Sequence, residues 1–248
     1  KPDPFVMQNR YKGDDGIEVI YIINSHINNS HNTSISFSKE ITSKRHGWKW
    51  DPETGNRYRI KLNTHNSLNL QMGPAESFLF VFDSESKGPE WKAIPSSGAS
   101  EKKLDEGLSA EFDHCNDGSV KTVELNTLND LKDIPELVNF AGTITYMNSF
   151  SITGQLSISC LNLGKVNGLC EVILNGKNLG ARWYGQRIYS IGGSLKEGKN
   201  EIEIKVVTSM GNYMKSLSNN PIAQYWTNEK NKVQPLQSMG LIGPVTIY

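Results

Sequence analysis

The chain has 248 residues, enough for one large domain or two medium ones. Its 26 Lys and Arg residues balance 26 Asp and Glu residues, so composition gives no support for nucleic acid or an anionic membrane surface as a partner. No run of about 18 apolar residues is present, so we expect no membrane-spanning segment. The sequence begins at Lys1 without a charged-then-apolar leader, and we expect a processed protein or a piece of a longer one.

Apolar residues alternate with polar ones along the first third of the chain, which is the pattern of strands with one buried face. Strands are expected over residues 17–23, 35–37 and 68–72. The continuous apolar run at 78–82 is typical of a strand buried on both faces. Short strands separated by Gly, Pro, Asn and Asp predict a β-sandwich.

Residues 84–101 are rich in Ser, Gly, Pro and Lys and form the expected junction between two domains. We place the domains at 1–88 and 89–248. Further strands are expected over 108–112, 120–125, 143–151, 156–161, 169–174, 187–191, 201–207 and 245–248, with a turn at Asp117 and Gly118. Residues 128–138 have helical spacing, but Pro135 limits a helix to a turn or two. Strands do not alternate with helices, so the predicted fold is all-β, with two antiparallel β-sandwich domains and little helix elsewhere.

Asn175 and Gly176 give the strongest local signal in the chain. They separate the apolar run at 172–174 from Leu179. A type I′ turn needs positive φ at both central residues, and Asn followed by Gly tolerates that conformation. The dipeptide therefore predicts a β-hairpin in the second domain.

The three cysteines, Cys115, Cys160 and Cys170, are too few and too scattered to indicate a disulfide framework or a zinc site. Cys160 and Cys170 share the parity of the apolar residues on their strands, so we expect buried free thiols. A disulfide between these two is the open alternative. We expect no cofactor and no metal ligand; a structural calcium ion stays open, without support from the sequence.

Several segments carry a family resemblance. Asn9 and Arg10, IYIIN at 20–24, WDPETG at 50–55 and PAESFLFVF at 74–82 resemble the β-sandwich that follows the catalytic barrel in glycoside hydrolase family 106, the α-L-rhamnosidase-like enzymes. WDPxTG is the specific element. NFAGTITY at 139–146, the hairpin region and residues 240–245 resemble the galactose-binding-like jelly roll, the sugar-binding domain of these enzymes and of family 2.

This resemblance implies a non-catalytic C-terminal accessory or carbohydrate-binding part of a secreted or periplasmic glycoside hydrolase that acts on plant or bacterial polysaccharide. The implied partners are carbohydrate and the catalytic barrel of the same polypeptide. A barrel of about 250 residues with alternating strands and helices is not encoded here. Two alternatives stay open: a free-standing carbohydrate-binding or adhesion module, and an autonomous glycosidase with a site between the two sandwiches.

Exposed loops carry residues suited to sugar contact, because sugar rings stack on Trp and Tyr and sugar hydroxyls bind Arg and Asn. Loops gather at the ends of a sandwich, so the loop at 180–187 and the long insertion between 207 and 240 are expected to come together. Such a long insertion is either functional or disordered. The candidate carbohydrate-binding residues are Arg182, Trp183, Tyr184, Arg187, Asn212, Tyr225 and Trp226.

Competing structural interpretations apply to several of these side chains. A loop Trp often covers the end of a core, and this interpretation is favoured for Trp48, Trp50 and Trp183. Glycosidase chemistry needs two carboxylates about 5 to 10 Å apart, and the loop acids Asp51, Glu53 and Glu76 qualify only if the fold brings them together. For Asp51 we favour a cap on the turn at 52–55. No catalytic residue is assigned.

Overall fold

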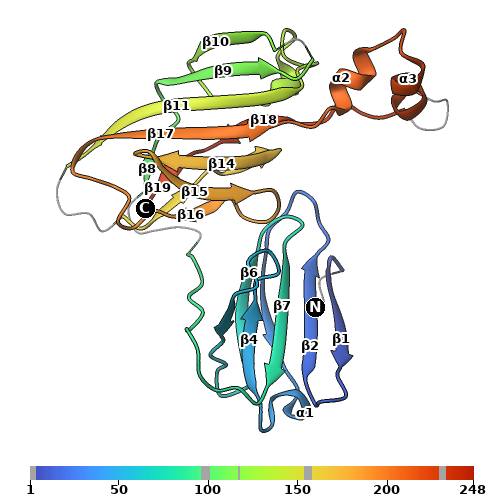
Figure 1. Cartoon of the computed structure of the whole chain (residues 1–248), viewed down its shortest axis with the longest axis vertical. Helices are drawn as coiled ribbons and strands as arrows, with labels where there is room; N and C mark the ends of the chain where they lie inside the picture. Colours follow the sequence, from blue (N-terminus) through green and yellow to red (C-terminus); the bar gives the residue numbers. More distant parts are fainter. Residues whose placement is uncertain (1–3, 96–100, 117, 154–157, 229–232) are drawn as a thin grey trace. The chain divides into compact units, whose positions relative to one another are not determined.

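The computed structural model describes residues 4–95, 101–116, 118–153, 158–228 and 233–248 (Figure 1). The chain divides into two compact units. Unit 1 comprises Lys1–Ala93 and Tyr184–Gln186, and unit 2 comprises Ile94–Trp183 and Arg187–Tyr248. The strand pairs within the described sheets are antiparallel, which confirms the all-β sandwich prediction.

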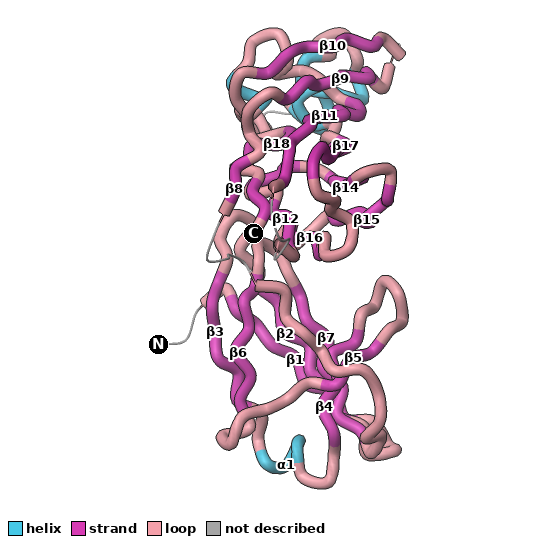
Figure 2. The backbone as a smooth tube through the Cα atoms, turned by 90° about the vertical axis from the view of Figure 1, so that its left-hand side faces the viewer, coloured by secondary structure: helices cyan, strands magenta, loops and turns pink. Residues whose placement is uncertain are grey.

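Unit 1 consists of two sheets. The larger has the strand order β1-β2-β7-β4-β5, and the smaller pairs β3 with β6. Figure 2 shows the β3–β6 pair beside the larger sheet. The strand bounds are β1 (Val6–Lys12), β2 (Glu18–Asn24), β3 (His31–Ser36), β4 (His46–Trp50), β5 (Arg57–Arg59), β6 (Ser67–Met72) and β7 (Ser77–Asp83), with the short helix α1 (Lys39–Thr42) between β3 and β4.

The core of unit 1 forms where the two sheets face each other. Phe78, Phe80 and Phe82 point into the core from β7, the central strand of the larger sheet. Leu70 and Met72 on β6 pack against them. The strands β2, β3, β6 and β7 lie where they were expected, whereas β1, β4 and β5 were missed. In β2 the alternating set that begins at Ile17 does not face the core, because the structure buries the other parity, Ile20 and Ile22. β1 is a largely exposed edge strand and β4 contains a glycine, so neither shows clean alternation.

Main-chain hydrogen bonds keep residues 89–91 in unit 1. The N–H of Arg59 donates to Pro89 O at 2.7 Å, and the N–H of Trp91 donates to Arg59 O at 2.8 Å. The Trp91 side chain packs against the core of the unit. Unit 1 therefore continues past residue 88, through these contacts with β5.

Unit 2 contains a six-stranded sheet, a four-stranded sheet and a separate strand pair. The six-stranded order is β10 (Val120–Leu125), β9 (Leu108–His114), β11 (Gly142–Ile152), β17 (Gly198–Val207), β14 (Leu169–Leu174) and β15 (Lys177–Arg182). The four-stranded order is β16 (Ile188–Ser190), β12 (Cys160–Asn162), β19 (Thr246–Ile247) and β8 (Lys102–Lys103), and β13 (Lys165–Asn167) pairs with β18 (Gly240–Gly243). One apolar core takes side chains from both sheets, for example Ile204 and Leu161.

The Asn175–Gly176 hairpin is confirmed. Both residues have positive φ, 52° and 78°, and Leu174 pairs with Lys177 across the turn. The Asn175 amide donates to Asn200 Oδ1 at 2.8 Å, and Asn175 Oδ1 accepts from the Glu201 N–H at 3.0 Å. The turn residue thus also anchors the hairpin to β17.

The buried thiols are confirmed as well. Cys160 and Cys170 are free and buried, and Cys115 is free and exposed. Within residues 128–138, only a short 3₁₀ turn forms (Leu131–Asp133), ahead of Pro135. The Asp130 side chain caps this turn by accepting from the Lys132 N–H at 3.2 Å.

The insertion after β17 differs from the expectation of little helix. It contains α2 (Gly211–Ser216) and α3 (Pro221–Thr227). Asn220 caps α3 by accepting from the N–H groups of Ile222 and Ala223. Asn before Pro is a helix-start signal that the Asn-rich composition obscured.

Some expected features lie outside the described residues. They are Asp117 of the predicted turn, residues 156–157 of a predicted strand and residues 229–231 of the Asn-rich run. None of the helices that the structure describes is long and apolar enough to cross a lipid bilayer.

Asn200 provides a test of the hairpin anchor. It is fully buried, its amide donates to Lys196 O at 2.8 Å, and its Oδ1 accepts from Lys196 N at 3.0 Å. Asn200→Ala leaves buried polar groups unsatisfied and should lower the free energy of unfolding by about 2 kcal/mol or more, measured by urea denaturation. Glu201 is exposed, so Glu201→Gln should unfold at the same urea concentration as the unsubstituted protein. If both variants unfolded at the same urea concentration, the anchoring role of Asn200 would be contradicted.

Candidate functional site

The seven predicted contact residues are divided between the units. Tyr184 belongs to unit 1, and the other six belong to unit 2. In unit 2, Arg182 and Val206 both pair with Cys170, from the two sides of β14. The loop after β15 and the insertion after β17 therefore leave the same end of the sheet.

Trp183 does not cover a core. Its side chain is 63 % exposed and belongs to none of the buried clusters, so the covering interpretation is wrong for this residue. Trp48 is fully buried and donates from Nε1 to Asp83 Oδ1 at 2.9 Å, but it also lies outside these clusters, because its register with Val81 places it on the outer face of the larger sheet. Trp50 is 38 % exposed and lies away from the core of unit 1.

Arg182 and Arg187 flank a buried thiol and phenol. Cys170 Sγ lies 3.3 Å from the Tyr189 hydroxyl, and the Arg182 guanidinium lies 4.9 Å from the centre of the Tyr189 ring. Burial raises the pKa of the Cys170 thiol and lowers the pKa of the Arg187 guanidinium. Arg187 is buried, whereas Arg182 is only half-buried. Of the two cations, Arg182 is thus the better placed to reach a ligand.

Asn212 joins the first part of the insertion to its last part. Its amide donates to Gln237 O at 2.9 Å, and its Oδ1 accepts from Gln237 N at 2.8 Å. The side chain is almost fully buried. Asn212 therefore holds α2 in place and is itself too buried to contact a ligand. The exposed residues of the insertion are better placed than Asn212 for such contact.

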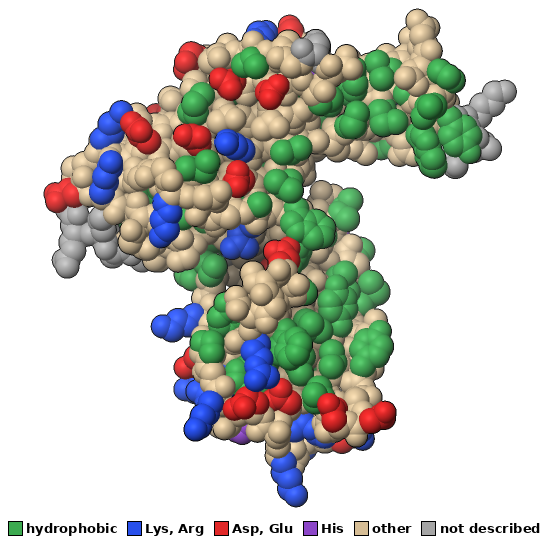
Figure 3. Space-filling view, viewed as in Figure 1, with side chains coloured by type: hydrophobic (Ala, Val, Ile, Leu, Met, Phe, Trp, Pro, Cys, Tyr) green, Lys and Arg blue, Asp and Glu red, His purple; other side chains and the backbone are tan. Residues whose placement is uncertain are grey.

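Tyr225 and Trp226 form an exposed aromatic pair on α3. Their ring centroids lie 5.3 Å apart in an edge-to-face arrangement, and the two side chains are 54 % and 59 % exposed. Met210 and Ile222 are also exposed on this insertion. We call Met210, Ile222, Tyr225 and Trp226 the insertion patch; Figure 3 shows apolar side chains gathered over α2 and α3. Met210 and Ile222 were not predicted as part of it.

Tyr184–Gln186 pack closely within unit 1. The N–H of Gly185 donates to Pro74 O at 2.9 Å. A Cβ on Gly73 would lie 2.4 Å from the backbone N of Gln186, so only glycine allows this approach. The short segment is thereby fixed beside the turn between β6 and β7.

Three loop acids affect the pKa of Tyr184. Burial raises the pKa of its hydroxyl, and the carboxylates of Glu53, Asp51 and Glu76 raise it further. Asp51 accepts from the Glu53 N–H at 3.0 Å and from Thr54 Oγ1 at 2.9 Å, which confirms the turn cap. Glu76 accepts from the Gly73 N–H at 2.6 Å. In the described part of the chain, no group of three or more His, Cys, Asp or Glu side chains is arranged to hold a metal ion.

The larger sheet of unit 1 has an unusually apolar outer face. Register places Tyr21, Leu79 and Trp50 in one row across three strands, opposite the core-facing residues. Met7 and Tyr11 on β1 are 51 % and 61 % exposed. The outer face of an antiparallel sheet is commonly polar, and a large apolar patch marks an interaction surface. The sequence of β2 indicated this apolar outer face, because apolar residues stand at both its odd and its even positions.

Comparisons with known proteins point to glycoside hydrolases. No protein-family model matches the chain. A putative beta-glucuronidase from Formosa agariphila is 37 % identical over 71 residues, which are 27 % of this chain and 6 % of that protein.

Solved structures give a longer match. A rhamnosidase from Novosphingobium sp. PP1Y aligns with 99 % of this chain and 25 % of its own chain, at 22 % identity and a TM-score of 0.63. A beta-glucuronidase from Ruminococcus gnavus aligns with 47 % of this chain and 22 % of its own, at 16 % identity and a TM-score of 0.40. The rhamnosidase match shows a shared fold, and this chain spans about a quarter of that longer protein.

A pair of tryptophan variants tests the assignment of Trp183. Trp183→Ala should change the free energy of unfolding by less than about 0.5 kcal/mol, because the side chain is exposed. Trp48→Ala should cost about 3 to 5 kcal/mol, because it empties a buried site. Urea denaturation of both variants measures the difference; a large loss in Trp183→Ala would restore the core-covering interpretation.

Proposed function

We propose that the chain is a non-catalytic, carbohydrate-binding accessory region of a larger glycoside hydrolase. The observation that carries this proposal is the fold match of 99 % of the chain to a quarter of a rhamnosidase chain. The local similarity to a putative beta-glucuronidase supports the same enzyme class.

The loop acids have structural tasks that favour a non-catalytic role. Glycoside hydrolysis uses two carboxyl groups that face each other across a sugar. Asp51 caps its own turn, and Glu76 accepts from a main-chain N–H within the turn between β6 and β7. Catalysis would then come from another part of the longer polypeptide, which is the partner that the proposal requires.

Carbohydrate contact is proposed for unit 2, as a galactose-binding-like sandwich. Trp183, Tyr225 and Trp226 offer exposed aromatic faces to the C–H groups of a sugar. The half-buried Arg182 provides hydrogen-bond donors at the end of β15. A polysaccharide substrate accords with a periplasmic or secreted location, which forms part of the proposal.

The first test is for hydrolysis by the isolated chain. It should not release chromophore from rhamnosides, galactosides or glucuronides above the buffer rate, because the proposed role leaves catalysis to another domain. Turnover that survives repurification and disappears on substitution of an Asp or Glu of this chain would overturn the non-catalytic role.

The second test is for binding. Trp183→Ala should weaken binding of a polysaccharide by about 1 to 3 kcal/mol, measured by affinity electrophoresis or titration calorimetry, because an aromatic contact is lost. Val120→Ala, which removes an exposed apolar side chain from the edge strand β10, is the control and should leave this affinity unchanged. The absence of sugar binding by the parent chain would contradict the carbohydrate-binding role.

A further inference from the structure

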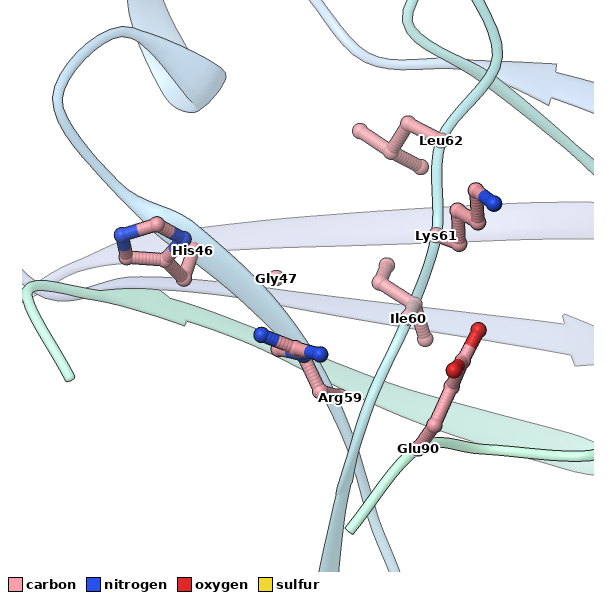
Figure 4. Close-up of a pocket in the computed structure, with 7 residues that line it drawn as sticks. All are labelled: His46, Gly47, Arg59, Ile60, Lys61, Leu62 and Glu90. Atoms are coloured by element: carbon pink, nitrogen blue, oxygen red, sulfur yellow. The ribbon is translucent and has the colours of Figure 1, made fainter. Parts of the chain in front are cut away.

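Unit 1 offers a ligand two surfaces. One is a hollow of about 380 Å³ beside β4 and β5 (Figure 4). Its lining is mostly polar, and Arg59 and Lys61 extend to opposite sides of the chain at Ile60, so these two cations do not converge on one ligand. The other surface is the outer face of the larger sheet, where the strand register fixes which side chains are neighbours.

One row of paired residues crosses all five strands of this face. Its members, in strand order, are Asn9, Tyr21, Leu79, Trp50 and Arg57. Residues paired in this way point to the same face of a sheet. Tyr21 and Trp50 are two strands apart, which places their Cα atoms about 10 Å from each other. Two aromatic side chains therefore stand on one face with only Leu79 between them, and Figure 3 shows apolar side chains gathered over β1, β2 and β7.

Tyr184 brings a third aromatic ring to one end of this face. The segment 184–186 is fixed beside the turn between β6 and β7, which leads into the central strand. Burial raises the pKa of the Tyr184 hydroxyl, and the groups that raise it further include Asp51, directly after Trp50, and Tyr21. Tyr184 thus lies near Tyr21 and near the end of β4.

Three carboxylates belong to the same end of the face. Asp51 and Glu53 follow β4 and Glu76 precedes β7, and the end of β4 lies beside the start of β7 because these strands are antiparallel. A Cβ on Gly185 would lie 2.9 Å from the carboxyl carbon of Glu76, so this acid packs against the segment 184–186. Asp51 and Glu76 each accept a main-chain N–H. A carboxylate has about four acceptor positions, so both retain capacity for the hydroxyl groups of a ligand.

The charges of this face favour an uncharged ligand that is rich in hydroxyl groups. Arg57, at the end of the row, pairs with Asp83 at 3.0 Å and lies 4.5 Å from the centre of the Trp48 ring, so its charge is balanced within the face. The carboxylates near Tyr184 would repel an anion, whereas they accept hydrogen bonds from hydroxyl groups. A protein partner would remove these carboxylates from water, at a cost that a hydroxyl-rich ligand avoids.

We infer that this face of unit 1 binds an uncharged sugar chain, with Tyr21, Trp50 and Tyr184 as its stacking rings. The rings contact the C–H groups of the sugar, and the nearby carboxylates accept hydrogen bonds from its hydroxyl groups. The choice of sugar as the ligand rests on the proposed function, but the site is separate from the contacts proposed for unit 2. Of the three rings, only Tyr184 was predicted to contact sugar.

The first measurement follows the tryptophan indole N–H signals of the whole chain by NMR spectroscopy. The chain has five tryptophans, and single substitutions assign their signals. The probes are neutral tetrasaccharides of glucose, galactose, mannose, xylose and rhamnose, with tetragalacturonate as the acidic comparison. At least one neutral probe should shift the Trp50 signal. In titration calorimetry, tetragalacturonate should bind about tenfold more weakly than this probe, because the carboxylates repel it.

Variants at Trp50 and Glu53 test stacking and charge separately. Trp50→Ala should weaken binding of the neutral probe about tenfold, whereas Trp50→Phe keeps a ring and should retain most of the affinity. Glu53→Gln should strengthen binding of tetragalacturonate about threefold, because one repelling charge is removed. Glu197→Gln makes the same change at an exposed position in unit 2 and should leave both affinities unchanged. If Trp50→Ala fails to fold, the Trp50 signal of the unsubstituted chain decides.

Several results would overturn the inference. A neutral probe that shifts the signals of Trp183 or Trp226 but not that of Trp50 would move recognition to unit 2, in favour of the proposed function alone. Equal or tighter binding of tetragalacturonate would remove the preference for uncharged sugar. Sedimentation of the unsubstituted chain as a dimer and of Trp50→Ala as a monomer would make this face an interface between copies.

Two further outcomes separate this site from the proposed function. A shift of the Trp50 signal alone would support the site in unit 1 and count against the contacts proposed for unit 2. Absence of binding by every probe would contradict both.

Discussion

The long antiparallel pairing of β11 with β17 is the constraint on which unit 2 depends. It runs from Thr143 opposite Val207 to Ile152 opposite Gly198 and places both strands in the middle of the six-stranded sheet. The register directs Ile144 and Ile204 to the same core. At one end, Thr208 exchanges hydrogen bonds with Gly142, where a Cβ would lie 2.0 Å from Asp113 O. These hydrogen bonds hold Thr208 at the end of β17 and so fix the position at which the insertion leaves the sheet.

Local patterns were sufficient for the features that depend on neighbouring residues. The alternation in β6, the buried strand β7 and the Asn175–Gly176 turn all follow from a few residues and their immediate surroundings. In β2 both parities are apolar, so alternation found the strand but not its buried face. Burial of Cys170 followed from its parity on β14. The exposed aromatic residues of the insertion were also evident, because Tyr225 and Trp226 stand in a polar segment.

Features that depend on pairing between distant residues could not be read in the same way. The return of residues 89–91 to β5 is one such feature, because no local pattern marks that bridge. Asn212 was predicted to contact sugar, but its partner is Gln237, which lies 25 residues later in the same insertion. Trp183 and Trp48 likewise look alike in sequence, and their opposite burial comes from the strands around them.

The two units present different kinds of apolar surface. In unit 2, the insertion patch and Trp183 expose apolar side chains beyond the ends of strands. In unit 1, Tyr21, Leu79 and Trp50 form a row across the outer face of the larger sheet. Each surface comes from a different structural feature, a long insertion in one unit and an apolar sheet face in the other.

The burial of two of the three cysteines has a practical consequence. Cys160 and Cys170 lie inside unit 2, and burial raises the pKa of the Cys170 thiol, so little reactive thiolate forms there. Cys115 is exposed in the turn after β9. A maleimide dye added to the native protein would thus modify one position in preference to the other two. The unmodified sequence already carries a single attachment point for a fluorophore, at the end of the sheet where β9 meets β10.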